Sequence, residues 1–102
     1  MSALEQCRLR SERALRRPTV RFERGADEKM SRARAAFSRE FFAAGGFQMV
    51  ESGVADLIVL CDADANYPSA REWPVLAAGP DFNRNSDHAA VIAAWLDRMG
   101  IA

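Results

Sequence analysis

Residues 57–61 (LIVLC) are all apolar, and two aspartates, Asp62 and Asp64, follow them almost at once. A short apolar run bounded by polar residues is consistent with a strand that is buried on both faces. Such strands are typical of parallel sheets that helices cover. The run therefore predicts an α/β fold in which the two aspartates lie at the carboxyl end of a central strand.

The two aspartates allow two interpretations. Open α/β sheets bind ligands at the carboxyl ends of their strands, and Mg²⁺ or Mn²⁺ prefers carboxylate oxygens. Enzymes that handle nucleotide sugars use a similar short motif, but a nucleotide-binding α/β region precedes it in those enzymes. The chain ahead of Asp62 is too short for such a region. We predict that Asp62 and Asp64 are structural or line a pocket, and that they bind no metal tightly.

The rest of the chain alternates between helix and strand patterns. Met30 and Phe41 lie on one side of a predicted helix, and the Gly45-Gly46 pair after it is typical of a helix end. Leu15 is placed on the apolar side of an earlier helix, which Pro18 stops. The predicted elements are a helix at 3–16, a strand at 19–23, a helix at 27–44, strands at 47–51, 56–61 and 74–78, and a final helix that Ser86 caps and that ends at Gly100 in a Schellman motif.

One connection is too short for a simple parallel arrangement. About five residues separate the second and third predicted strands, whereas a parallel crossover needs a dozen or more. Either these two strands pair antiparallel, or a crossover helix is missing and the sheet is reorganised. The sequence leaves both alternatives open.

The composition sets limits on class and partners. The chain has 102 residues, 49% of them apolar, which is enough for one small domain with one core. Its net charge of zero hides a front part, residues 1–40, of +5 and a back part, residues 41–102, of −5. The arginines alternate with carboxylates, so we expect solvated faces and ion pairs rather than nucleic-acid binding. Cys7 and Cys61 lack metal-ligand spacing, and no apolar run approaches the ~20 residues that span a bilayer. These features predict a reduced, cytoplasmic protein with no membrane contact.

The sequence offers no catalytic constellation. His88 is the only histidine. It falls in the first turn of the last predicted helix, where we expect a surface or capping role. Gly45 and Gly46 follow a helix, whereas the glycines that cradle phosphates precede one. We therefore predict no catalytic residue.

Two stretches resemble one known family. Residues 33–50 (ARAAFSREFFAAGGFQMV) resemble the first helix and second strand of the cobalamin-binding-type domain of methylmalonyl-CoA mutases, above all of their small, non-catalytic subunit. Residues 57–67 are similar to a Cys-x-x-Asp-x-x-Tyr segment of that subunit, matched by Cys61, Asp64 and Tyr67. The resemblance implies a short flavodoxin-like, three-layer sandwich with a mostly parallel sheet and reduced crossover helices. It divides the chain into a helical arm, 1–17, and a domain, 18–102, with Asp62, Asp64 and Tyr67 as pocket candidates.

The chain departs from the family at the cofactor loop. Members that bind cobalamin carry Asp-x-His-x-x-Gly there, and the histidine coordinates cobalt. Asp27 matches the aspartate, but Lys29 stands at the histidine position and Arg32 at the glycine position. A protonated lysine has no lone pair for a metal, and an arginine crowds the close approach that glycine permits. We therefore expect cobalamin binding to be lost and no other cofactor to be present.

The resemblance implies a non-catalytic subunit or interaction module. Its partner would be the mutase large subunit or a second copy of the chain, which would cover the sheet face that the missing crossover helices leave open. Phe42 lies off the main apolar side of its helix, and we expect it to reach such a partner. Two alternatives stay open: a small metal- or nucleotide-dependent α/β enzyme centred on Asp62 and Asp64, and a ligand-binding module whose ligand has changed.

Overall fold

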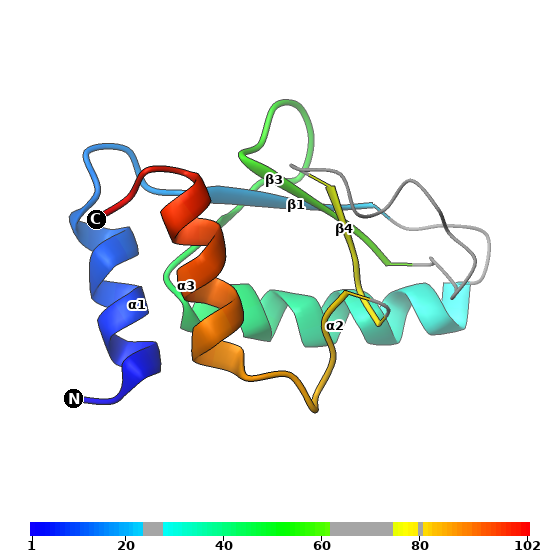
Figure 1. Cartoon of the computed structure of the whole chain (residues 1–102). Helices are drawn as coiled ribbons and strands as arrows, with labels where there is room; N and C mark the ends of the chain where they lie inside the picture. The colour runs from blue at the N-terminus through cyan, green and yellow to red at the C-terminus, as the bar shows by residue number, and fades with distance from the viewer. Residues whose placement is uncertain (24–27, 62–74, 80) are drawn as a thin grey trace.

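The computed structural model of the chain describes residues 1–23, 28–61, 75–79 and 81–102 (Figure 1). The helices and strands follow one another in the predicted order. They are α1 (Ala3–Arg13), β1 (Thr19–Glu23), α2 (Glu28–Ala44), β2 (Gln48–Met49), β3 (Leu57–Leu60), β4 (Val75–Ala77) and α3 (His88–Arg98).

The strands form a parallel sheet in the order β2-β1-β3-β4. β1 pairs with β2 on one side and with β3 on the other, and β3 also pairs with β4. This confirms the predicted α/β fold with a parallel sheet, and the arrangement is compatible with a small flavodoxin-like fold.

The short connection between β2 and β3 is explained by their positions on opposite sides of β1. β2 contacts only the start of β1, where Thr19 pairs with Gln48 and Val20 with Met49, and β3 begins opposite the same Val20. The chain therefore crosses a single strand between residues 50 and 56, and these residues form no helix. Of the two open alternatives, the missing crossover helix is correct and antiparallel pairing is wrong.

Asp56 holds this crossing against the start of β1. Its Oδ2 accepts hydrogen bonds from Thr19 N at 3.0 Å and Thr19 Oγ1 at 3.1 Å, and its own backbone N donates to Thr19 Oγ1 at 2.9 Å. Arg16 adds an ion pair to Asp56 Oδ1 at 2.8 Å. The Arg16 side chain is largely exposed, so the Thr19 contacts fix the crossing more than the ion pair does.

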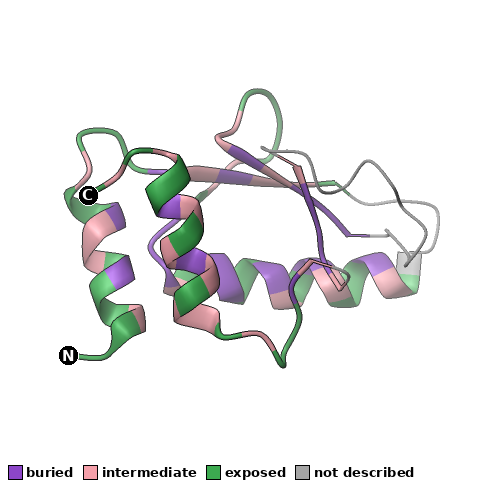
Figure 2. Ribbon diagram, in the orientation of Figure 1, coloured by how far each residue is buried: buried purple, intermediate pink, exposed green. Residues whose placement is uncertain are grey.

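The main core lies between one face of the sheet and the helices. All three described helices lie on that face, with α2 running along the sheet and α1 beside α3 at one end (Figure 1). The strand side chains of Val20, Leu57 and Val59 are fully buried against Ile92 and Leu96 of α3 and against the aromatic residues of α2. Buried residues accordingly run along the inner sides of the helices (Figure 2).

Phe42 belongs to this core. Its side chain is fully buried, and its ring centroid lies 5.3 Å from that of Phe41, 5.2 Å from Phe47 and 5.5 Å from Phe82. The prediction that Phe42 reaches a partner is therefore wrong. The apolar stripe of α2 is wider than its spacing suggests, because the segments of Phe47 and Phe82 pack against it as well as the sheet.

The opposite face of the sheet is also largely buried where the structure describes it. Leu60 and Ala77 are buried there, and Ile58 and Val75 pack on them half-buried. The large apolar side chains that are exposed among the described residues lie outside the strands: Met1, Leu15 and Val54. The strands therefore show no open apolar face. Leu15 is exposed because α1 ends at Arg13, before the predicted position.

The Gly45-Gly46 pair ends α2 as predicted. Gly46 has a φ of 87°, and the turn is a Schellman motif in which Phe47 N donates to Phe42 O at 3.1 Å and Gly46 N to Ala43 O at 2.9 Å. The Phe42 and Phe47 rings in contact supply the apolar pair that accompanies such motifs.

The three helices meet at this turn. A Cβ on Gly45 would lie 2.8 Å from Cγ2 of Ile92 on α3, and one on Gly46 would lie 2.7 Å from Cβ of Ser11 and 2.9 Å from the backbone O of Arg8 on α1. Ser11 also donates through Oγ to Gly45 O at 2.6 Å. The two glycines therefore allow α1 and α3 to approach the end of α2.

The start of α3 differs from the prediction by one residue. Asp87 is its N-cap and accepts from Ala90 N at 3.1 Å, whereas Ser86 Oγ accepts from Asn83 N at 2.9 Å and so stabilises the preceding loop. Ser86 is therefore not the cap. The predicted Schellman end at Gly100 is confirmed.

The opposite charges of the two parts of the chain pair with each other. Arginines of the basic front part reach carboxylates of the acidic back part in three ion pairs: Arg10–Asp97 at 2.7 Å, Arg16–Asp56 at 2.8 Å and Arg39–Glu51 at 3.8 Å. This confirms the expectation of ion pairs.

Within the described residues, none of the helices combines the length and the apolar character needed to cross a membrane.

Candidate functional site

The predicted site residues fall into two groups. Asp27, Asp62, Asp64 and Tyr67 lie outside the described residues, so their predicted roles stay predictions. Lys29 and Arg32 are exposed on the first turns of α2, where they line a shallow hollow together with Ala33 and Ala36.

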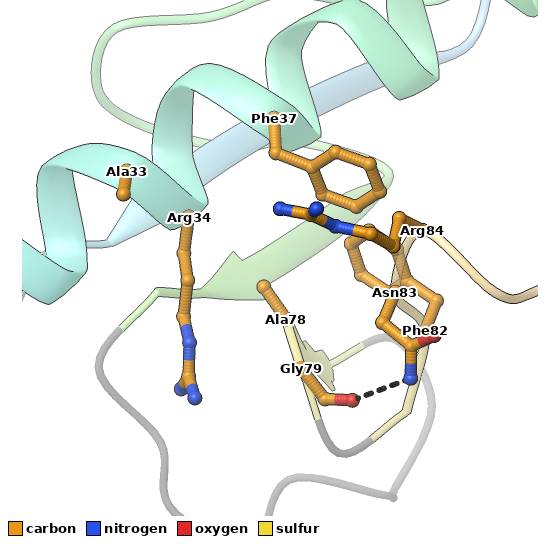
Figure 3. Close-up of a pocket in the computed structure, with 8 residues that line it drawn as sticks. All are labelled: Ala33, Arg34, Phe37, Ala78, Gly79, Phe82, Asn83 and Arg84. Atoms are coloured by element: carbon orange, nitrogen blue, oxygen red, sulfur yellow. Dashed lines mark hydrogen bonds between the residues drawn. The ribbon is translucent and has the colours of Figure 1, made fainter.

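A cavity of about 230 Å³ lies between α2 and the loop that follows β4 (Figure 3). The carboxyl end of a parallel strand is the edge at which open α/β sheets bind ligands. The cavity is therefore at the expected position for a ligand. Its lining residues are Ala33, Arg34, Phe37, Ala78, Gly79, Phe82, Asn83 and Arg84.

The loop after β4 is built by local hydrogen bonds. Ala77 N donates to Asp81 Oδ2 at 2.7 Å, and Gly79 N donates to Phe82 O at 2.8 Å. Asn83 then donates through Nδ2 to Gly79 O at 3.2 Å, as the dashed line in Figure 3 shows. The loop thus turns Phe82 into the core and leaves Asn83 at the edge of the cavity.

Gly79 allows Arg34 to form one wall. The φ of Gly79 is 98°, and a Cβ at this position would lie 2.9 Å from Cζ and 3.0 Å from Nη2 of Arg34. The guanidinium group therefore lies against the backbone of Gly79. The positive φ favours glycine at this position, and a Cβ would displace the end of the Arg34 side chain.

Two aromatic rings form the apolar part of the cavity. The Phe37 ring on α2 is half-buried and the Phe82 ring is buried, with their centroids 6.1 Å apart and their planes at 23°. These rings are fixed because Phe82 also packs on Phe41, at 4.9 Å between centroids, and on Phe42. The apolar wall is therefore preformed.

The charge at the cavity is positive where the structure describes it. Arg34 and Arg84 line it, and the described lining residues include no carboxylate. Ala33 borders both the cavity and the hollow that contains Lys29 and Arg32, so four cationic side chains lie along this part of the molecule. Such an arrangement favours an anionic ligand.

Neither His88 nor Cys7 belongs to this site. His88 Nε2 lies 2.6 Å from Phe41 O, and its ring stacks on Phe41 at 3.9 Å between centroids. Since a carbonyl only accepts hydrogen bonds, Nε2 carries the proton. Gly45 N donates to Phe42 O and therefore not to Phe41 O, four residues before it. His88 supplies the missing donor to Phe41 O in the last turn of α2. His88 therefore caps the end of α2, whereas the sequence predicted a surface or capping role at the start of the last helix.

Cys7 is buried between α1 and α3, where its Sγ lies 3.6 Å from Ala89 O. Burial raises the pKa of the Cys7 thiol, although the positive charge of Arg10 opposes this. A thiol held protonated in this way is a poor nucleophile. Within the described part of the chain, no group of three or more His, Cys, Asp or Glu side chains is placed to hold a metal ion.

The residues that line the cavity were not among those predicted from the sequence. The available signal was Gly79 at the end of the fourth predicted strand, followed within five residues by Phe82 and Arg84.

No protein-family model, curated protein or solved structure matches the chain.

Proposed function

We propose that this chain is a non-catalytic binding module that holds a small ligand in the cavity at the carboxyl end of β4. The observation that carries the proposal is a preformed cavity with aromatic and cationic walls at the sheet edge where parallel α/β domains bind ligands. Its volume of about 230 Å³ lies below the ~300–1,000 Å³ of drug-sized ligand sites, which favours a ligand of few atoms.

The lining residues favour binding over catalysis. General acid–base catalysis needs a group that exchanges a proton near neutral pH, and covalent catalysis needs a nucleophile. The described lining side chains are alanine, phenylalanine, asparagine and arginine, with one glycine. The alternative of a metal- or nucleotide-dependent enzyme depends on Asp62 and Asp64, which lie outside the described residues.

We further propose that the module is a shortened, cobalamin-free relative of the small subunit of methylmalonyl-CoA mutase. The resemblance of residues 33–50 and 57–67 supports this origin. The parallel sheet and the glycine turn at the end of α2 are compatible with it. Lys29, at the position of the cobalt-binding histidine, is exposed on α2.

Cobalamin is expected not to gain a protein ligand from this chain. A protonated lysine at position 29 offers no lone pair, and His88 Nε2 is engaged with Phe41 O. Titration of aquocobalamin at micromolar protein, followed by its visible spectrum, should show no histidine-ligated species. A histidine-type spectrum that His88→Gln abolishes would show that His88 leaves Phe41 and coordinates cobalt.

A subunit role is the second function that we propose, with the mutase large subunit or a second copy as partner. The resemblance of residues 33–50 and 57–67 to the small subunit of the mutase supports it. Light scattering at low micromolar concentration should then show the chain in a species heavier than the 11.3 kDa of one chain. This species is either an oligomer in the sample of the chain alone, or a complex that contains the chain in the sample with the large subunit. A mass of 11.3 kDa for the chain in both would contradict a subunit role.

The binding proposal can be tested by mapping where small molecules bind. Amide signals of the ¹⁵N-labelled chain would be followed during separate titrations with benzyl alcohol, benzylamine, benzoate and phenyl phosphate. We expect that at least one of these shifts the amides of residues 33–37, 78, 79 and 81–84, without being chemically altered. Shifts confined to other parts of the chain, or none with any of the four, would contradict it.

A further inference from the structure

We propose that the ligand of this cavity is a small organic anion, in which a phosphate or carboxylate group is joined to a flat apolar group. This inference rests on the proposed binding function and specifies its ligand. It also assigns Arg84 as the residue that selects for the negative charge.

Arg84 favours an anionic ligand. Its side chain is exposed and extends from the loop after β4 toward Phe37 on α2 (Figure 3). Hydrogen bonds of the neighbouring residues fix the backbone on both sides of Arg84. Asn85 N donates to Asn83 Oδ1 at 2.8 Å, and Asn83 N donates to Ser86 Oγ at 2.9 Å. Arg84 forms no ion pair with a described residue. A guanidinium group on a fixed backbone, with no ion pair to a described residue, is suited to bind a carboxylate or phosphate through two parallel hydrogen bonds.

The surroundings of Arg84 strengthen the preference for negative charge. Lys29 and Arg32 are both exposed and lie along the adjoining hollow, which shares Ala33 with the cavity. Positive side chains that lie near one another on a surface raise the local concentration of anions.

The half-buried ring of Phe37 favours a ligand with a flat apolar group. The buried ring of Phe82 lies behind it, with centroids 6.1 Å apart and planes at 23°, and so holds the Phe37 ring in a fixed direction. The exposed Ala33 extends this apolar surface without a long side chain, and Ala78 is buried. An inorganic phosphate would leave this surface unused, whereas a ring or short planar chain would bury it.

Calorimetric titration with phenyl phosphate tests the assignment. The wild-type chain should bind phenyl phosphate more tightly than inorganic phosphate, which lacks the ring, and more tightly than benzyl alcohol, which lacks the charge. Arg84→Gln should weaken phenyl phosphate binding at least about tenfold, the effect expected for the loss of a charge-assisted hydrogen bond. Arg13→Gln removes the same charge from an exposed position on α1 and should change the affinity less than about twofold.

Benzoate distinguishes the two kinds of anion. Tighter binding of benzoate than of phenyl phosphate assigns a carboxylate ligand, and the reverse order assigns a phosphate ligand.

The inference is overturned if Arg84→Gln binds both anions as tightly as wild type does, or if benzyl alcohol binds as tightly as the anions. If neutral benzyl alcohol shifts the cavity amides as strongly as the anions do, only the charge assignment fails and the binding proposal survives. If no compound shifts those amides, both fail.

Discussion

Gly46→Ala is expected to lower the free energy of unfolding by about 3 kcal/mol, from the strain of a positive φ together with overpacking. Gly46 has a φ of 87°, and its new Cβ would lie 2.7 Å from Cβ of Ser11 and 2.9 Å from the backbone O of Arg8. Because a backbone atom of α1 is in the way, the helix itself would have to move. Urea denaturation followed by circular dichroism measures the change.

Gly100→Ala is the matched control for this prediction. Gly100 occupies the same place in the Schellman motif of α3, with a φ of 74°, but a Cβ there would meet no atom within 4 Å. It should therefore cost about 1 kcal/mol, from the positive φ alone. Equal losses for the two variants would show that α1 does not pack on the end of α2 as described.

Phe42→Ala should lower the free energy of unfolding by about 4 kcal/mol, the usual cost of removing a buried phenylalanine side chain. The ring is fully buried and touches the rings of Phe41, Phe47 and Phe82, so its loss leaves a cavity that these fixed neighbours cannot fill. Since small domains are stable by only ~5–15 kcal/mol, the variant should unfold at a clearly lower urea concentration.

Two further variants keep the Phe42 prediction testable even if the alanine variant fails to fold. Phe42→Leu retains much of the side-chain volume and should lose less than half as much stability. Leu15→Ala removes an apolar side chain that is fully exposed, and should change stability by less than about 0.5 kcal/mol. A loss for Phe42→Ala no larger than that for Leu15→Ala would return Phe42 to the surface and restore its predicted role in partner binding.

The helices and strands could be predicted because their signals are local. The apolar run 57–61 indicated a buried strand, and β3 pairs on both sides within a parallel sheet. Gly45-Gly46 indicated a helix end because the αL conformation of a Schellman turn favours glycine, and the turn has that geometry. These inferences need no knowledge of which segments meet.

Strand order and the cavity could not be predicted, because they depend on segments far apart in the chain. The sequence shows that the connection between β2 and β3, residues 50–56, is short. It does not show that β2 is short enough to pair only with the start of β1. Phe42 lay off the expected apolar side because the contribution of Phe82 to the core is not visible in the spacing of α2. The cavity joins Arg34 and Phe37 of α2 to Phe82 and Arg84 of a loop about 50 residues later, and no motif links them.

A crystal structure of the chain with phenyl phosphate would show directly whether the cavity binds this ligand. The phosphate should lie within hydrogen-bonding distance, ~3 Å, of the Arg84 guanidinium group, and the phenyl ring should lie against Phe37. Phenyl phosphate bound elsewhere on the chain, with this cavity empty, would contradict this prediction.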